Sequence, residues 1–167
     1  MGKFSIYATE MKWMDETDET EDLCLHGHAV VCIGKKKLEY DAAISATALY
    51  LLKTLTENHI MRTDNQLLPC CGFSLFPNET LDNVVILGCD NEIDWSVVHD
   101  GDTVILELED GTRETISIDE YKKEVFKFAD TVETFYKSCA SKKMPKDKVD
   151  RDGYIAFWNE WHRRRNQ

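Results

Sequence analysis

The strongest secondary-structure pattern in the chain lies in residues 93–139, which read IDWSVVHDGDTVILELEDGTRETISIDEYKKEVFKFADTVETFYKSC. Two Asp-Gly pairs, at residues 100–101 and 110–111, separate three short runs rich in Val, Ile, Leu and Thr. Asp-Gly between alternating apolar residues is typical of a tight hairpin turn, because glycine readily adopts the positive φ angles that such turns need. Residues 93–116 are therefore predicted to form a three-stranded antiparallel meander.

The same stretch ends in a helical pattern. Ser117 followed by Glu120 matches the capping box, in which a serine side chain satisfies a backbone N–H at the start of a helix. The apolar residues after it recur at alternating intervals of three and four: Ile118, Tyr121, Val125, Phe128, Val132, Phe135 and Cys139. This spacing predicts a long helix packed across the sheet. A short coiled-coil seam between two copies of the chain is the alternative.

Toward the N-terminus, alternating apolar residues predict strands at residues 3–9 and 23–33, and a short strand at 38–40. Asp41 is predicted to cap a core-facing helix that runs to about Asn58. The uninterrupted apolar run at residues 84–87 predicts a central strand buried on both faces.

The remaining segments are a packed loop and a C-terminal helix. Residues 66–77 contain two prolines and a glycine, and are predicted to form a loop with one short strand. Residues 141–149 are rich in lysine and are predicted to link the body to a helix at 150–165. The predicted fold class is α+β, in a single domain of residues 1–167. It has a mostly antiparallel sheet with a three-stranded meander, packed by two long helices and a C-terminal aromatic helix.

The net charge of −11 is unevenly distributed. Residues 1–121 carry eight Lys and Arg against 24 Asp and Glu, a net −16, whereas residues 122–167 carry 12 against seven, a net +5. An acidic body repels nucleic-acid backbones and anionic membranes and attracts basic proteins. We therefore expect a basic protein partner, no nucleic acid and no membrane.

The sequence also predicts a cytoplasmic location. No stretch approaches the roughly 18 apolar residues that a membrane-spanning helix needs. The N-terminal residues lack the apolar segment of a secretory signal. The six cysteines are interpreted as reduced thiols, several of them in apolar strand patterns.

A metal site is one alternative for the polar residues near the second strand. Strand alternation places Cys24, His26 and His28 on one face, and Cys70 and Cys71 from the loop could complete four ligands for zinc. The spacing matches no common zinc motif, and half-buried polar residues on a strand explain it equally well. The prediction is therefore no metal and no cofactor.

A cysteine nucleophile is the other chemical alternative. Cys70 or Cys71 lies beside a glycine in a proline-flanked loop, and His28 could act as the base. No phosphate-binding glycine loop and no zinc-protease or serine-hydrolase motif is present. We therefore expect a non-enzyme, with a cysteine- or zinc-dependent hydrolase as the alternative.

Two segments are candidates for binding a partner. The first is an acidic loop that contains Asp15, Glu16, Asp18, Glu19, Glu21 and Asp22. The second is the aromatic stripe of the C-terminal helix, formed by Tyr154, Phe157, Trp158 and Trp161. The favoured function is an acidic binding protein, for example an inhibitor or immunity-type protein for a basic partner. A homodimeric scaffold is the further alternative.

Overall fold

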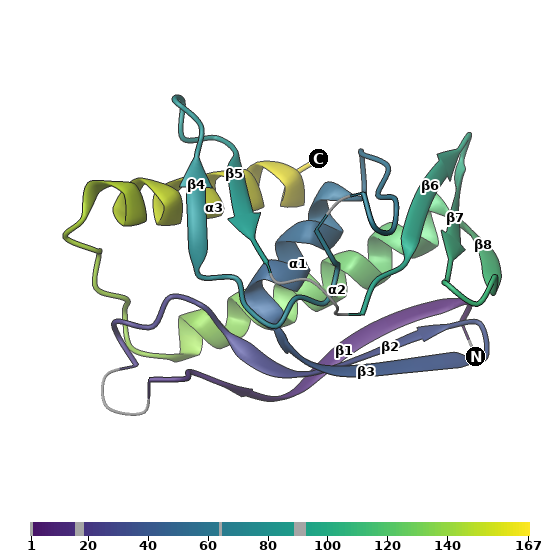
Figure 1. Cartoon of the computed structure of the whole chain (residues 1–167), viewed down its shortest axis with the longest axis horizontal. Helices are drawn as coiled ribbons and strands as arrows, with labels where there is room; N and C mark the ends of the chain where they lie inside the picture. The colour runs from purple at the N-terminus through teal and green to yellow at the C-terminus, as the bar shows by residue number, and fades with distance from the viewer. Residues whose placement is uncertain (1, 16–18, 64, 89–92) are drawn as a thin grey trace.

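The computed structural model describes residues 2–15, 19–63, 65–88 and 93–167 (Figure 1). Within these ranges lie eight strands: β1 (Phe4–Lys12), β2 (His26–Ile33), β3 (Lys36–Ala43), β4 (Ser74–Pro77), β5 (Val84–Leu87), β6 (Ser96–Asp100), β7 (Thr103–Glu107) and β8 (Arg113–Ser117). The helices in the described ranges are α1 (Ile44–Lys53), α2 (Ile118–Ser138) and α3 (Lys148–Arg165). The fold class is α+β, as predicted.

The described strands pair antiparallel in three separate sheets, of order β1-β2-β3, β4-β5 and β6-β7-β8. In Figure 1, the first sheet forms the lower layer and α1 and α2 lie above it. The β4–β5 hairpin and α3 form the upper layer, and β6–β8 close one end. None of the helices in the described part of the chain is both long enough and apolar enough to pass through a membrane.

The first sheet confirms the three predicted strands with different bounds: β1 continues to Lys12 and β3 to Ala43, but β2 begins at His26 rather than at residue 23. Ala29, Val31 and Ile33, on one face of β2, are completely buried. The prediction that Asp41 caps a helix was wrong. Asp41 lies within β3 and pairs with His28, since β3 continues its ladder with β2 as far as Ala43.

Helix α1 is shorter than predicted and lies at the centre of the fold. It begins at Ile44 without a side-chain cap and ends at Lys53 rather than at Asn58. The Thr54 hydroxyl that follows it donates to the carbonyl of Leu51 and bonds Tyr121 of α2. All residues from Ile44 to Leu52 are buried, which is typical of a helix surrounded by other elements.

The predicted meander and the helix after it are both confirmed. Gly101 and Gly111 have positive φ angles of 59° and 81° in the two turns. The Ser117 side chain accepts from the Glu120 N–H and donates to its carboxylate. Helix α2 buries its apolar face within the chain, against α1, β1 and the meander, so the sheet-packed interpretation of this helix holds.

The prediction for residues 84–87 was wrong. β5 pairs with β4 in a two-stranded sheet of the described residues, instead of lying at the centre of a larger one. Val84 and Ile86 are buried, but Val85 is 57% and Leu87 51% exposed. Only the inner face of β5 meets the protein, so this apolar run is half exposed.

The C-terminal helix begins earlier than predicted, at Lys148, so that its first two residues fall within the expected linker. The reason is Asp147, whose side chain accepts from the backbone N–H groups of Val149 and Asp150 and caps the helix. The predicted short strand in residues 66–77 is present as β4.

Candidate functional site

The loop at Cys70 and Cys71 lies against β2 and the start of α1, close to Cys24. Gly72 approaches so closely that an added Cβ would lie 2.5 Å from the Ala46 side chain and 3.7 Å from the Cys24 sulfur. Cys24 is 3% exposed, and its burial raises the pKa of its thiol to about 12. A thiol with that pKa stays protonated and unreactive at neutral pH.

The two histidines of β2 have other partners. The Nδ1 atom of His26 lies 3.0 Å from the carbonyl oxygen of Cys24. The Nδ1 atom of His28 lies 2.7 Å from the Asp41 carboxylate, and its Nε2 atom lies 3.8 Å from Glu39. The hydrogen bond to Asp41 raises the pKa of His28 above its ordinary value. Within the described residues, no three His, Cys, Asp or Glu side chains are arranged to hold a metal ion.

The acidic loop is folded back onto its own chain. Asp22 accepts from the backbone N–H groups of Met14, Asp15 and Cys24, which fixes the base of the loop. On the other side, Lys142 donates to the Glu19 carbonyl and Lys143 pairs with Glu21 at 3.6 Å. Of the other predicted partner-binding residues, Glu16 and Asp18 lie outside the described residues.

The aromatic stripe of α3 faces the interior of the protein. Tyr154 is 8%, Phe157 4% and Trp161 0% exposed, and Trp158 is half-buried between them. Trp158 packs edge-on against Tyr136 of α2, with ring centroids 5.0 Å apart. In this fold, the stripe holds α3 to α2 and to the core.

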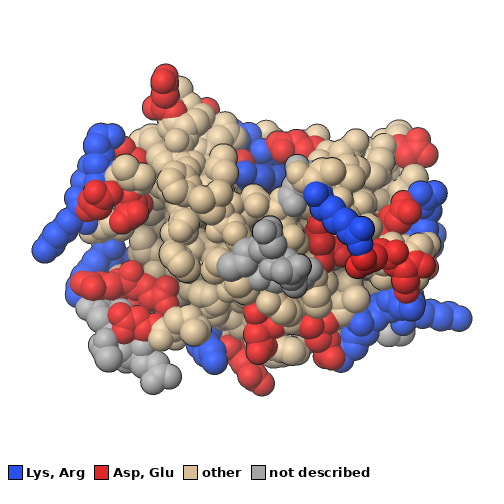
Figure 2. Space-filling view, viewed as in Figure 1, with Lys and Arg blue, Asp and Glu red and all other residues tan. Residues whose placement is uncertain are grey.

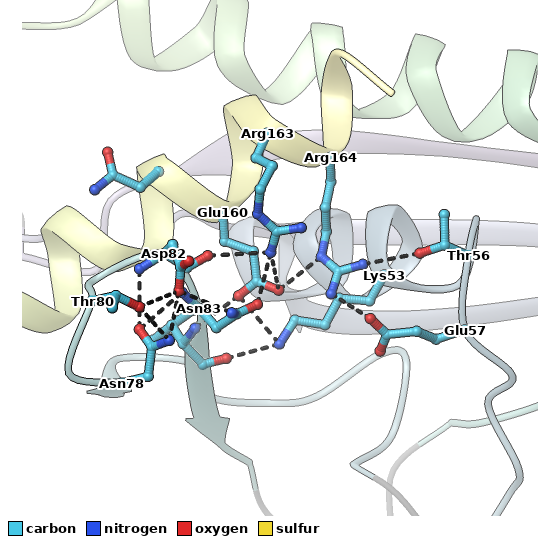
Figure 3. Close-up of polar contacts among 12 residues, drawn as sticks. Lys53, Thr56, Glu57, Asn78, Thr80, Asp82, Asn83, Glu160, Arg163 and Arg164 are labelled. Carbon is cyan, nitrogen blue, oxygen red and sulfur yellow. Dashed lines mark hydrogen bonds and ion pairs between the residues drawn. The ribbon is translucent and has the colours of Figure 1, made fainter.

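A buried charge network joins α3 to α1 and β5 (Figure 3). Its centre is Glu160, which is completely buried. One carboxylate oxygen accepts from Arg164 Nε at 2.7 Å, and the other accepts from the Val84 N–H at 2.8 Å and lies 3.5 Å from Lys53 Nζ. This network was not predicted from the sequence. The only signal is the i, i+4 spacing of Glu160 and Arg164, which is common on exposed helices.

The arginines at the end of α3 thus find partners within the chain. Arg164 also pairs with Glu57, Arg165 forms two hydrogen bonds to Asp130, and Arg163 donates to Asn83. The basic C-terminal segment and the acidic body therefore meet within one molecule.

Exposed apolar side chains gather on the outer face of the β4–β5 hairpin. Cross-strand pairs share a face of an antiparallel ladder, which places Phe76 with Val85 and Ser74 with Leu87 on this side. Phe76 is 47% exposed and Phe73, just before β4, is 69% exposed. We call the surface formed by Ser74, Phe76, Val85 and Leu87 the hairpin face. Exposed apolar groups gathered in this way mark interaction surfaces in soluble proteins.

The two edges of the hairpin are covered, which leaves the hairpin face as its open side. Along β5, the Val84 carbonyl accepts from Lys53, and the Ile86 carbonyl accepts from Tyr50 and Asn65. Along β4, the Leu75 carbonyl lies against Gly153 of α3, at 2.4 Å from where a Cβ would stand. Another chain is therefore unable to extend this sheet as an added strand.

In Figure 2 the front of the hairpin is formed by uncharged residues, with acidic side chains at its tip. The tip contains Glu79 and Asp82, both exposed. Hydrogen bonds from Asn78, Thr80 and Asn83 lower the pKa of Asp82 below its ordinary value. The hairpin face was missed because all four residues of β5 are apolar, which hides the alternation of buried and exposed positions.

Comparison of the chain with protein-family models, with curated proteins and with solved structures gave no match.

Proposed function

We propose that this chain is a non-enzymatic binding protein that docks another protein on the hairpin face. The observation that supports the proposal is the exposure of Phe76, Val85 and Leu87 on one side of a two-stranded sheet. Large apolar side chains gain little for folding when half of their surface stays in water. Their burial by a partner would supply the driving force for association.

The proposed partner carries apolar residues flanked by lysine or arginine. Glu79 and Asp82 at the hairpin tip lie at one end of the face, and the chain as a whole carries a net charge of −11. Complementary charge speeds the encounter of two proteins and fixes their orientation, while the apolar contacts provide most of the affinity. An inhibitor of a basic protein is the biological role that fits this chemistry best.

The partner binds through side chains rather than through backbone hydrogen bonds. Both edges of the hairpin are occupied, β5 by side chains from α1 and neighbouring segments and β4 by α3. An amphipathic helix laid across the hairpin face meets this requirement, because its backbone groups are already satisfied within the helix.

Selection of displayed random peptides on the immobilised protein tests the proposal. We expect enrichment of peptides that combine apolar residues at helical spacing with Lys or Arg. Their binding should weaken at high salt. The double variant Phe76→Ser with Val85→Ser should abolish binding. Val149→Ser is the matched control, since Val149 in α3 is 52% exposed and lies outside the face.

Three results would contradict the proposal: no enrichment, enrichment of acidic peptides, or equal binding by the double variant. A second copy of the chain is the alternative occupant of the hairpin face, and light scattering of the purified chain tests for it. A dimer that the double variant converts to a monomer would show that a second copy covers the face, and would replace the proposed partner.

A further inference from the structure

A polar cavity of about 560 Å³ lies on the side of β5 that faces α1. Its walls come from the C-terminal half of α1, from residues 57–63 and 65–67, and from Val85 and Ile86 of β5. This volume falls in the range of sites for small molecules. The cavity is separate from the predicted Cys and His site, and the proposed docking of a protein makes no use of its interior.

The cavity walls are held in place by hydrogen bonds. His59 forms a backbone bridge with Val97 of β6, and its ring lies 2.7 Å from the buried Asp94 carboxylate. The Asn58 side chain accepts from the His99 N–H, and the Asn65 side chain donates to the Ile86 carbonyl. These hydrogen bonds thus tie Asn58 and His59 to β6 and Asn65 to β5, which gives a preformed site.

The ion-pair network beside the cavity contains more cations than carboxylates. The ion pairs of the described network join three cations, Lys53, Arg163 and Arg164, to two carboxylates, Glu57 and Glu160. Lys53 Nζ lies 2.8 Å from the Val84 carbonyl and 3.5 Å from Glu160. Within the described residues, these two contacts use two of the three ammonium donors of Lys53, whose side chain lines the cavity.

The electrostatics of Lys53 agree with this geometry. Burial lowers its pKa, and the nearby Glu160 carboxylate does not fully offset that effect. A partly buried ammonium with a shared counter-ion gains from a further negative charge. At the rim of the cavity, Arg62 adds a second cation, which pairs with Glu109 and has a side chain that is 76% exposed.

We propose that the cavity binds a small organic anion, whose carboxylate or phosphate group contacts Lys53 while its polar body contacts Asn58, Asn65 and Gln66. Carboxamides both donate and accept hydrogen bonds, and thus suit hydroxyl or amide groups of such a ligand. Leu67 and Ile86 supply an apolar wall.

Titration of the full chain with acetate and, separately, with inorganic phosphate tests the inference by two-dimensional amide NMR, at constant ionic strength set by chloride. We expect saturable shifts confined to residues 50–67 and 84–87, with dissociation constants on the order of millimolar. The stronger of the two probes identifies which anionic group the site prefers. Shifts that fail to saturate, or that spread equally over surface lysines, would overturn the inference.

Lys53→Met keeps the aliphatic stem and removes the charge, so affinity should fall about tenfold or more. Lys127→Met is the matched control, because Lys127 is 70% exposed on α2 and far from the cavity walls; it should bind as the unaltered chain does. Arg62→Met changes the rim without touching the buried network and should weaken binding about threefold. If Lys53→Met is not folded by circular dichroism, Arg62→Met decides: unchanged affinity there refutes the site.

Discussion

Glu160 is the residue whose chemistry most constrains this fold. A fully buried carboxylate is costly to desolvate, and it is tolerated because Arg164, Lys53 and the Val84 N–H all contact it. Those contacts come from three separate elements. The side chain therefore fixes how α3, α1 and β5 sit relative to one another.

Replacing Glu160 by glutamine should lower the free energy of unfolding by about 3 kcal/mol, because Arg164 and Lys53 would keep their charges with less compensation. Glu107→Gln is the matched control, since its pair with Arg113 is exposed and should contribute less than about 1 kcal/mol. Urea unfolding followed by fluorescence measures both. Equal losses for the two variants would show that the Glu160 network contributes no more than a surface pair.

His28 gives a prediction about pH. Its hydrogen bond to Asp41 raises its pKa above 6.5, so the folded state binds the proton more tightly than the unfolded state does. The resulting stabilisation is complete below the unfolded pKa and is lost as the pH rises through the folded pKa. NMR titration of the ring should give a pKa above 6.5, and Asp41→Asn should lower it. A pKa unaffected by Asp41→Asn would contradict the assigned cause.

At the residue scale, sequence patterns predicted local partners but not distant ones. The Ser117 cap was predictable because both of its groups lie within four residues. The pairs of Asp41 with His28 and of Glu160 with Val84 depend on strand register and helix docking, which local spacing does not specify. The hairpin face and the cavity lined by Lys53 depend on the same long-range packing.

Helix α3 and strand β4 approach each other closely at Gly153. The β4 backbone passes so near that an added Cβ would lie 2.4 Å from the Leu75 carbonyl oxygen and 2.8 Å from the Leu75 Cβ. Gly153→Ala should therefore destabilise the protein by about 1–3 kcal/mol, although the same change in an exposed helix stabilises it by about 1 kcal/mol.

Thr134→Ala, at an exposed position of α2, is the control and should be neutral or slightly stabilising. Thermal unfolding distinguishes the two signs. A stabilising effect of Gly153→Ala would mean that α3 and β4 are less closely packed than described.

The periodicity of apolar residues was sufficient to predict some helices and strands but not others. The meander and α2 were predictable because turn residues, caps and apolar spacing agree with one another over residues 96–138. β5 was mispredicted because a four-residue apolar run is compatible with burial on one face or on both. The choice depends on which faces of the sheet other elements cover, and in the described residues only the inner face of β5, with Val84 and Ile86, is covered.

For the whole molecule, the linker between α2 and α3 should be open to proteases although α3 is firmly packed. Residues 143, 144 and 146 are exposed, whereas Phe157, Glu160 and Trp161 are buried. After cleavage by trypsin at Lys143 or Lys146, the two fragments should co-elute in native gel filtration and separate in strong denaturant. Mass spectrometry identifies the cleavage sites. Separation of the fragments in native buffer would show that α3 is only loosely attached.

The contacts of Glu160 with Val84 and of Gly153 with Leu75 have a consequence for the order of events during synthesis. Residues 4–53 can pair and collapse as soon as they leave the ribosome, since their ladders are local. Residues 74–87 have to wait until residues 148–165 have been translated, because a lone two-stranded hairpin is marginal in water. Nascent chains shorter than this would therefore carry an unfinished hairpin, with Leu75, Val84 and Ile86 open to chaperones.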